Sequence, residues 1–311
     1  MFQANLRLAP PAKGQEGGAV GWRVVSTIGF LLLVGLCDAA SGEELARLHR
    51  SSPLQASTSR ETMRDAVRAI PLAQLEANAR AKASSVLANV SVFRRLPVSV
   101  VGCDPDLHLF LVRHPDVVVN IWEVLKISRL QLREIAPKTF QMTETAGTLA
   151  TMEFLYESPE MHIVYGEGTY DGPLFAKPVR GKCLIVLRTG YVREPNGRHY
   201  ITNRLDTFLN IEHGGAELLT KTFHPLVGGV ADRNFLQSVR FLGSLSRTAE
   251  VNSRGVQRLA SRLEHVEPVL RARLAVLAEQ IARQSPLSVS ESEPAPADTP
   301  SAPPRVARSE P

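Results

Sequence analysis

The short motifs that carry common enzyme chemistries are missing from this sequence. It contains no GxSxG, HExxH, GxGxxG or P-loop pattern, so nothing in it points to the hydrolase, zinc-protease, dinucleotide or nucleotide chemistry that these motifs support. Cysteine is scarce, with 3 residues in 311, and no CxxC or Cys/His spacing is typical of a zinc site. We therefore predict no catalytic residue, no metal and no cofactor.

Clustered charge is also missing. The formal net charge of +5 is spread along the chain, and no group of Lys and Arg residues alternates with aromatic residues, which make up only 6% of the sequence. Proteins that bind nucleic acids gather basic residues on one face, so we predict no nucleic-acid partner. The apolar content of 44% is ordinary, and it supplies material for one substantial core.

No apolar run reaches the usual length of a membrane span. The longest uncharged run, Val24 to Cys37, has about 14 residues, whereas a helix needs roughly 17–25 to cross a bilayer. Basic residues precede this run and small residues follow it, which is typical of a secretory signal cut after Ala39. We predict a signal peptide over residues 1–39 and export to the periplasm or cell envelope. The alternative is an uncleaved membrane anchor formed by residues 24–37.

Cleavage at that place would leave two cysteines, Cys103 and Cys183. In an oxidising compartment this pair could form a disulfide, which would stabilise the protein by closing a long loop. The alternative is two separate buried thiols, because unpaired cysteine is among the most buried residue types. Cys183 lies in an apolar segment, which suits that alternative. The sequence leaves both open.

Helical periodicity dominates the region 40–96. Ser59 is a good helix cap, and Met63, Val67 and Ile70 follow it at helical spacing. Residues 97–102 then predict a short strand.

Two short helices follow that strand. Asp104 is placed to cap the first of them, with Pro105 at its first position, and a second Pro-Asp pair begins the next helix. Their carboxylates are explained by capping, so the sequence DPDLH (104–108) does not indicate a metal site.

After these helices the period changes to two. Segments rich in β-branched and aromatic residues alternate apolar and polar positions and end at Gly, Pro or Asn. Residues 194–197, Glu-Pro-Asn-Gly, form a strong turn signal between the last two segments. We predict a six-stranded antiparallel sheet from the segments 129–136, 139–145, 148–158, 161–170, 182–192 and 199–212.

Helical periodicity returns at Ala216 and continues to about Gln284. An amphipathic sheet must bury one face, so the long helix directly after the last strand should cover it. We predict an α+β domain over 97–250, flanked by the N-terminal helices and by a C-terminal helix over 251–284. Residues 285–311 are rich in Pro and Ser, have few large apolar residues, and are expected to be disordered.

This order of elements resembles the helix-grip fold of the START-like superfamily, which includes polyketide cyclases and lipid-transfer domains. The segment HPDVVVNIWEVL (114–125) is similar to a helix common in that superfamily. Phrases such as YDGPLFAKPVRGKC and ADRNFLQSVRFLGSLSRTAE also resemble an uncharacterised family of exported proteins of planctomycete bacteria. The first resemblance implies a cavity between the sheet and the long helix for an apolar or amphipathic ligand. The second implies a compartment and an architecture, and it brings no established activity or catalytic residue with it.

Strand alternation gives candidate residues for such a cavity. Asn203, Thr207 and Tyr165 are polar groups on the parity expected to face inward, and buried polar groups need partners. Arg204 and Asp206 have the opposite parity and are expected on the outer face, paired with each other or with water. The alternative is a core filled by its own side chains. The predicted ligand-binding residues are Tyr165, Asn203, Thr207, Met152, Phe154, Tyr156, Leu187 and Leu205.

Three functions remain open. The first is an exported START-like domain that binds an apolar small molecule or lipid without catalysis. The second is a structural protein of the cell envelope that docks a protein partner through the apolar stripe of residues 256–283, with the Pro-rich tail as a tether. The third is a cyclase-like enzyme that uses Tyr165, Asn203 and Glu167.

Overall fold

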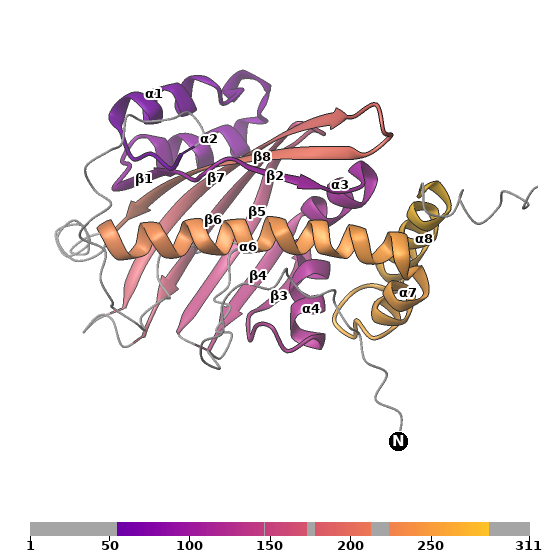
Figure 1. Cartoon of the computed structure of the whole chain (residues 1–311). Helices are drawn as coiled ribbons and strands as arrows, with labels where there is room; N and C mark the ends of the chain where they lie inside the picture. Colours follow the sequence, from indigo (N-terminus) through magenta and orange to yellow (C-terminus); the bar gives the residue numbers. More distant parts are fainter. Residues whose placement is uncertain (1–54, 146, 173–177, 213–223, 286–311) are drawn as a thin grey trace, which may run out of the picture.

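A computed structural model describes residues 55–145, 147–172, 178–212 and 224–285. The predicted signal segment and almost all of the predicted disordered tail lie outside these residues. The described part is an α+β fold in which helices pack on both faces of one large antiparallel sheet (Figure 1). Among the described helices, none combines the length and the apolar character that crossing a membrane requires.

The described chain begins with the predicted N-terminal helices. They are α1 (Arg60–Arg68), the short 3-10 helix η1 (Leu72–Gln74) and α2 (Ala77–Leu87). Ser59 caps α1 as predicted, because its side chain accepts a hydrogen bond from the Thr62 backbone amide.

Within the described residues the sheet has eight strands, in the order β1-β8-β7-β6-β5-β4-β3, with β2 also paired to β8. The six strands expected from the sequence are all present, joined in antiparallel fashion by the pairs β3–β4 to β7–β8. Their bounds are β3 (Gln131–Ala136), β4 (Thr139–Glu144), β5 (Thr148–Glu157), β6 (Met161–Tyr170), β7 (Val179–Arg193) and β8 (His199–Ile211).

The prediction of a six-stranded sheet was incomplete. β2 (Ser99–Gly102) is the short strand expected near residues 97–102, and it joins the same sheet rather than standing apart. β1 (Val92–Arg95) lies in the region predicted to be helical. Both pair with β8, which has 13 residues and therefore has room for two short partners along one edge. A four-residue strand is too short for alternation to reveal it.

Two helices expected after β2 form as the sequence indicates. α3 (Pro105–Arg113) has Asp104 as its cap, and the Asp104 carboxylate accepts a hydrogen bond from the Leu107 amide at 2.9 Å. α4 (Pro115–Val124) follows with Pro at its start.

The turn predicted at 194–197 also forms. Gly197 has a φ of 80° there, a backbone conformation that favours glycine.

The two faces of the sheet carry different helices. α1 and α2 pack on one face, where their apolar residues share a buried cluster with Phe93, Ile163, Leu184 and Phe208. The other face meets α6 (His224–Val251), which runs across the strands in Figure 1.

Close contacts fix α6 against β1 and β2. Arg94 donates two hydrogen bonds to the Asp232 carboxylate, from Nε at 2.8 Å and from Nη2 at 2.5 Å. Near the other end of the helix, a Cβ added to Gly243 would lie 2.2 Å from the Val101 side chain. Glycine at that position therefore lets α6 come close to β2.

The predicted single C-terminal helix over 251–284 is two helices, α7 (Ser253–Ser261) and α8 (Pro268–Gln284). Proline at the first turn of α8 begins a new helix instead of continuing the old one. The apolar stripe expected to dock a protein partner is buried in the cluster that also contains α3 and α4 residues. Its buried members are Val256, Leu259, Leu263, Val266, Leu274, Leu277 and Ile281. This stripe is part of the protein's own core.

Candidate functional site

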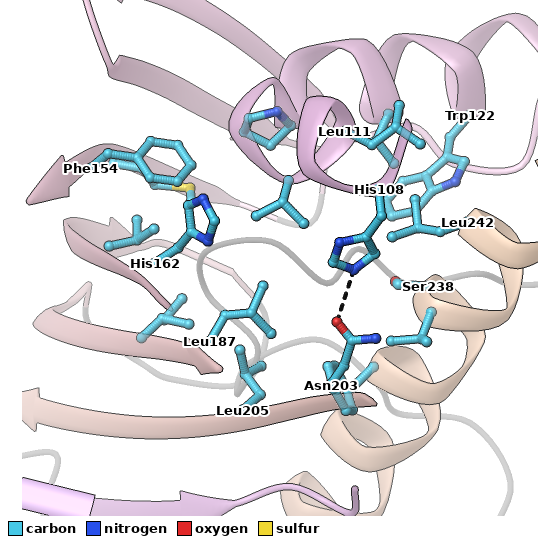
Figure 2. A pocket seen from close by; sticks show the side chains of 18 residues that line it. His108, Leu111, Trp122, Phe154, His162, Leu187, Asn203, Leu205, Ser238 and Leu242 are labelled. Carbon is cyan, nitrogen blue, oxygen red and sulfur yellow. Dashed lines mark hydrogen bonds between the residues drawn. The ribbon is translucent and has the colours of Figure 1, made fainter. Parts of the chain in front are cut away.

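A cavity of about 140 Å³ lies between the sheet and the helices α3, α4 and α6. Most of its lining side chains are aliphatic or aromatic. From the helices come residues such as Leu111, Trp122 and Leu242, and the strands β5 to β8 supply the opposite wall (Figure 2). Polar atoms enter this lining from His108, His162, Asn203 and Ser238.

Five of the eight residues predicted to contact a ligand line this cavity. They are Met152, Phe154, Leu187, Leu205 and Asn203. The register explains why they share one face, since Leu187 of β7 pairs with Leu205 of β8. Their contact with a ligand stays a prediction.

Tyr165 and Tyr156 lie on the opposite face of the sheet, in the cluster formed with α1 and α2. The predicted inward parity of β6 was off by one residue, because Phe154 pairs with Val164 and so places Val164 at the cavity. Tyr156 is displaced for a different reason. The register shifts between Phe154 and Tyr156, and such a bulge reverses the parity of the residues beyond it.

Both tyrosines have hydrogen-bond partners on that opposite face. The Tyr165 hydroxyl donates to the Glu167 carboxylate at 2.5 Å, and the Tyr156 hydroxyl donates to Gln74 Oε1 at 2.9 Å. Burial, reinforced by Glu167, raises the pKa of Tyr165 above its usual value. The three residues of the cyclase-like alternative therefore do not converge, since Tyr165 and Glu167 lie across the sheet from Asn203.

Thr207 shares the face of Asn203 and Leu205 but does not line the cavity. Its hydroxyl donates a hydrogen bond to the backbone oxygen of Arg94 at 3.0 Å. The side chain is thereby used to hold β1 against β8, and this occupied hydroxyl explains why it is not offered to a ligand.

Asn203 has a buried partner that the sequence does not predict. His108 Nε2 lies 2.9 Å from Asn203 Oδ1, and the two side chains are 1% and 2% exposed (Figure 2). Burial lowers the pKa of His108 to about 4, although the bond to Asn203 opposes that change. The imidazole is therefore neutral at physiological pH. Its Nδ1 atom and Asn203 Nδ2 are buried and have no partner among the described residues.

His162 is the second histidine at the cavity. It lies on β6, is 2% exposed, and has no hydrogen-bond partner for either ring nitrogen among the described residues. Its ring meets the Phe154 ring edge-on, with 6.2 Å between centroids. Burial lowers its pKa to about 4, against the opposing charge of Glu157. The correct parity of β6 would have identified this residue from the sequence, because His162 alternates with Val164.

Among the described residues that line the cavity, none is Asp, Glu, Lys or Arg. Within the described residues, no three His, Cys, Asp or Glu side chains gather in a way that could hold a metal ion. His108 and His162 supply only two nitrogen ligands between them, whereas metal sites usually use three or four protein ligands. The arrangement is suited to hold an uncharged molecule by shape and hydrogen bonds.

Cys103 and Cys183 are buried thiols, and no disulfide joins them in the structure. The Cys103 thiol points to the backbone oxygen of Leu242 on α6, at 3.8 Å. Burial raises the pKa of each thiol to about 12. A thiol that stays protonated is a poor nucleophile, so these residues fit the alternative of two separate packing cysteines.

Comparison with known proteins identifies no family. No family model matches the chain, and no curated protein matches it. Similar solved structures include a conserved protein from Geobacillus kaustophilus, with 12% identity, a TM-score of 0.34, and coverage of 46% of this chain and 90% of that one. The lipid transfer and protein localization domain of human StarD13 has 10% identity and a TM-score of 0.24, covering 47% of this chain and 76% of that one.

A dicamba monooxygenase bound to dicamba is also similar, with 11% identity and a TM-score of 0.32. That match covers 72% of this chain and 65% of the monooxygenase chain. These likenesses are distant.

Proposed function

We propose that this protein binds a small, mainly apolar molecule in the cavity between the sheet and α6, and that it performs no chemistry on it. The observation that carries the proposal is an apolar cavity lined by a few neutral polar side chains, of which His108 Nδ1, Asn203 Nδ2 and both ring nitrogens of His162 have no partner among the described residues. Binding sites for small molecules combine an apolar lining with a few polar groups that set orientation. A filled core would have left no such space.

The volume limits the ligand. An engineered cavity of about 150 Å³ lined by apolar side chains binds benzene, whereas pockets for drug-sized molecules occupy about 300–1,000 Å³. At about 140 Å³, the cavity matches a molecule with a single ring. The sequence predicted either an apolar small molecule or a lipid as the ligand. A long acyl chain would need more room than this cavity provides, so we propose a small molecule and not a lipid.

The helix-grip arrangement and export belong to the same proposal. Buried contacts of Phe235 and Val239 on α6 with Leu205 and Leu209 on β8 support a sheet gripped by a long helix. Export is supported by the sequence of residues 1–39 alone. It is tested by mass spectrometry of the protein recovered from the soluble envelope fraction of its host, where a species beginning near Ala40 is expected.

The cavity is tested with benzene and toluene as probes, titrated into the purified protein and followed by protein NMR. We expect both to bind, with shifts confined to residues around the cavity. Val164→Phe should abolish this binding, because Val164 lines the cavity and a phenyl group would fill it.

Val192→Phe is the matched control, since Val192 is on β7 and 57% exposed, and it should leave binding unchanged. Equal binding by the two variants, or no binding of either probe to the unchanged protein, would show that the cavity is not a binding site.

A further inference from the structure

Two atoms of the His108–Asn203 pair, His108 Nδ1 and Asn203 Nδ2, are buried and have no hydrogen-bond partner among the described residues, and both side chains line the cavity. If His108 Nε2 donates to Asn203 Oδ1, then His108 Nδ1 remains an acceptor and the Asn203 amide remains a donor. If the Asn203 amide is turned and donates to Nε2 instead, His108 Nδ1 carries the proton and Asn203 Oδ1 remains an acceptor. Each arrangement leaves the pair with one donor and one acceptor for a ligand, at exchanged positions.

His162 offers a second donor and a second acceptor. A neutral imidazole has one N–H and one bare nitrogen, and neither ring nitrogen of His162 has a partner among the described residues. A buried polar group without a partner is destabilising, because it has given up its hydrogen bonds to water. A ligand that supplies hydrogen-bond partners to these nitrogens therefore binds more tightly than one that does not.

The two groups face the same space from different elements. Figure 2 shows the His108–Asn203 pair on one side of the cavity and His162 on the other. His108 comes from α3, Asn203 from β8 and His162 from β6. A single molecule in a cavity of about 140 Å³ is therefore flanked by both groups.

The surroundings favour an uncharged molecule. A charge buried without an opposite charge is strongly unfavourable, and the lining supplies none. Two charged groups act on the pKa of His162 in opposite directions, since Glu157 raises it and Arg113 lowers it. His108 is the third titratable group that acts on this pKa, and it also lowers it. His108 itself is affected mainly by burial and by its bond to Asn203.

We propose that the ligand is an uncharged single-ring molecule with two polar substituents, which bond to the His108–Asn203 pair and to His162, respectively. Hydroxyl groups on an aromatic ring have this chemistry, because each can donate and accept a hydrogen bond. The inference depends on the function proposed above, and it adds the ligand class and the residues that select it.

The test compares five probes on the unchanged protein by calorimetric titration. They are benzene, phenol, resorcinol, hydroquinone and benzoate. Each hydroxyl that finds a partner should tighten binding roughly three- to tenfold, as expected for one net hydrogen bond. We expect one of the two dihydroxybenzenes to bind most tightly, phenol to follow, then benzene, and benzoate to bind worst.

Two variants locate the selectivity. His162→Leu should remove the advantage of the second hydroxyl while benzene binding persists. His199→Leu is the control, because His199 is a partly exposed histidine at the start of β8 that does not line the cavity. It should leave the whole order of affinities unchanged. The series on the unchanged protein carries the test alone should the His162 variant fail to fold.

The outcomes separate the two proposals. If benzene binds and the hydroxylated probes bind no better, or if benzoate binds best, the ligand class is wrong and the cavity function stands. If no probe binds, both proposals fall. If hydroquinone or resorcinol binds best and His162→Leu reduces it to the level of phenol, the inference holds.

Discussion

The α1 face of the sheet and the lining of the cavity hold polar groups in opposite ways. On the face covered by α1, the buried Arg95 guanidinium donates to both oxygens of Asp206, at 2.6 and 3.0 Å, and a third bond reaches Asp65 at 3.2 Å. In the lining of the cavity, the buried polar residues His108, Asn203 and His162 carry no charge, and several of their nitrogen atoms have no partner among the described residues.

The difference follows from what each face encloses. A buried charge needs an opposite charge with well-directed hydrogen bonds, and the α1 face is packed closely enough to supply one. Next to an empty space no such partner is held in place, so only neutral groups are tolerated there. The α1 face therefore contributes to stability. The cavity lining, in contrast, has hydrogen-bonding nitrogen atoms without partners among the described residues.

Removing a polar partner on the α1 face should have the largest effect on stability. Asp206→Asn should lower the free energy of unfolding by about 3–5 kcal/mol, because it leaves the Arg95 charge buried without its main counter-charge. Asp65→Asn is the control, since the Asp65 side chain is 52% exposed, and it should cost about 0–1 kcal/mol. Urea denaturation measures both. Similar losses for the two variants would contradict the assignment of Asp206 as the structural anion.

The second largest effect on stability should come from lowering the pH, through the two histidines of the cavity lining. The pKa values of His108 and His162 are about 4 in the folded protein, against an ordinary 6.5, so the unfolded chain binds more protons between these values. Their contribution is complete above about pH 6.5 and is lost as the pH falls through about 4. At about 1.36 kcal/mol per pH unit, the shift corresponds to about 3 kcal/mol for each histidine.

Asp116 opposes this trend, because burial raises its pKa to about 6 and its contribution is lost as the pH rises through that value. His162→Leu isolates the contribution of His162, because Asp116 is unchanged in this variant. The loss of unfolding free energy between pH 6.5 and 4, measured by urea denaturation, should be smaller in the variant by about 3 kcal/mol. An unchanged slope would show that His162 is not buried as a neutral base.

At neutral pH, removing the polar group on the cavity face should stabilise the protein, the reverse of the effect at Asp206. His162→Leu deletes two buried nitrogens that have no partner among the described residues, and it should raise the free energy of unfolding by about 1–3 kcal/mol. Thermal and urea unfolding measure the gain. A loss of stability would mean that the ring nitrogens are satisfied, for instance by ordered water, and would weaken the case for a ligand there.

Local patterns in the sequence were sufficient for much of the fold. Strand alternation located the six long strands, Ser59 and Asp104 were correctly predicted as caps, and residues 194–197 as a turn. These features depend on a few neighbouring residues, which is why one sequence reveals them. β1 was missed because its four residues become a strand only by pairing with β8.

The site was only partly predictable for the same reason. Alternation placed Met152, Phe154 and Asn203 on one face correctly, but a single bulge displaced Tyr156 and a register offset displaced Tyr165. Asp206, expected on the outer face, is 0% exposed, and its carboxylate is paired with Arg95, which also bonds to Asp65 of α1.

The sequence by itself determined the order of helices and strands, their caps and turns, and the α+β class, because these are set by local periodicity and backbone chemistry. Only the tertiary structure decided which residues meet at the cavity. His108 and Asn203 are 95 positions apart, and their contact depends on how α3 packs over β8. The charge states of both histidines were decided there too, since burial, a property of the packed molecule, lowers their pKa values.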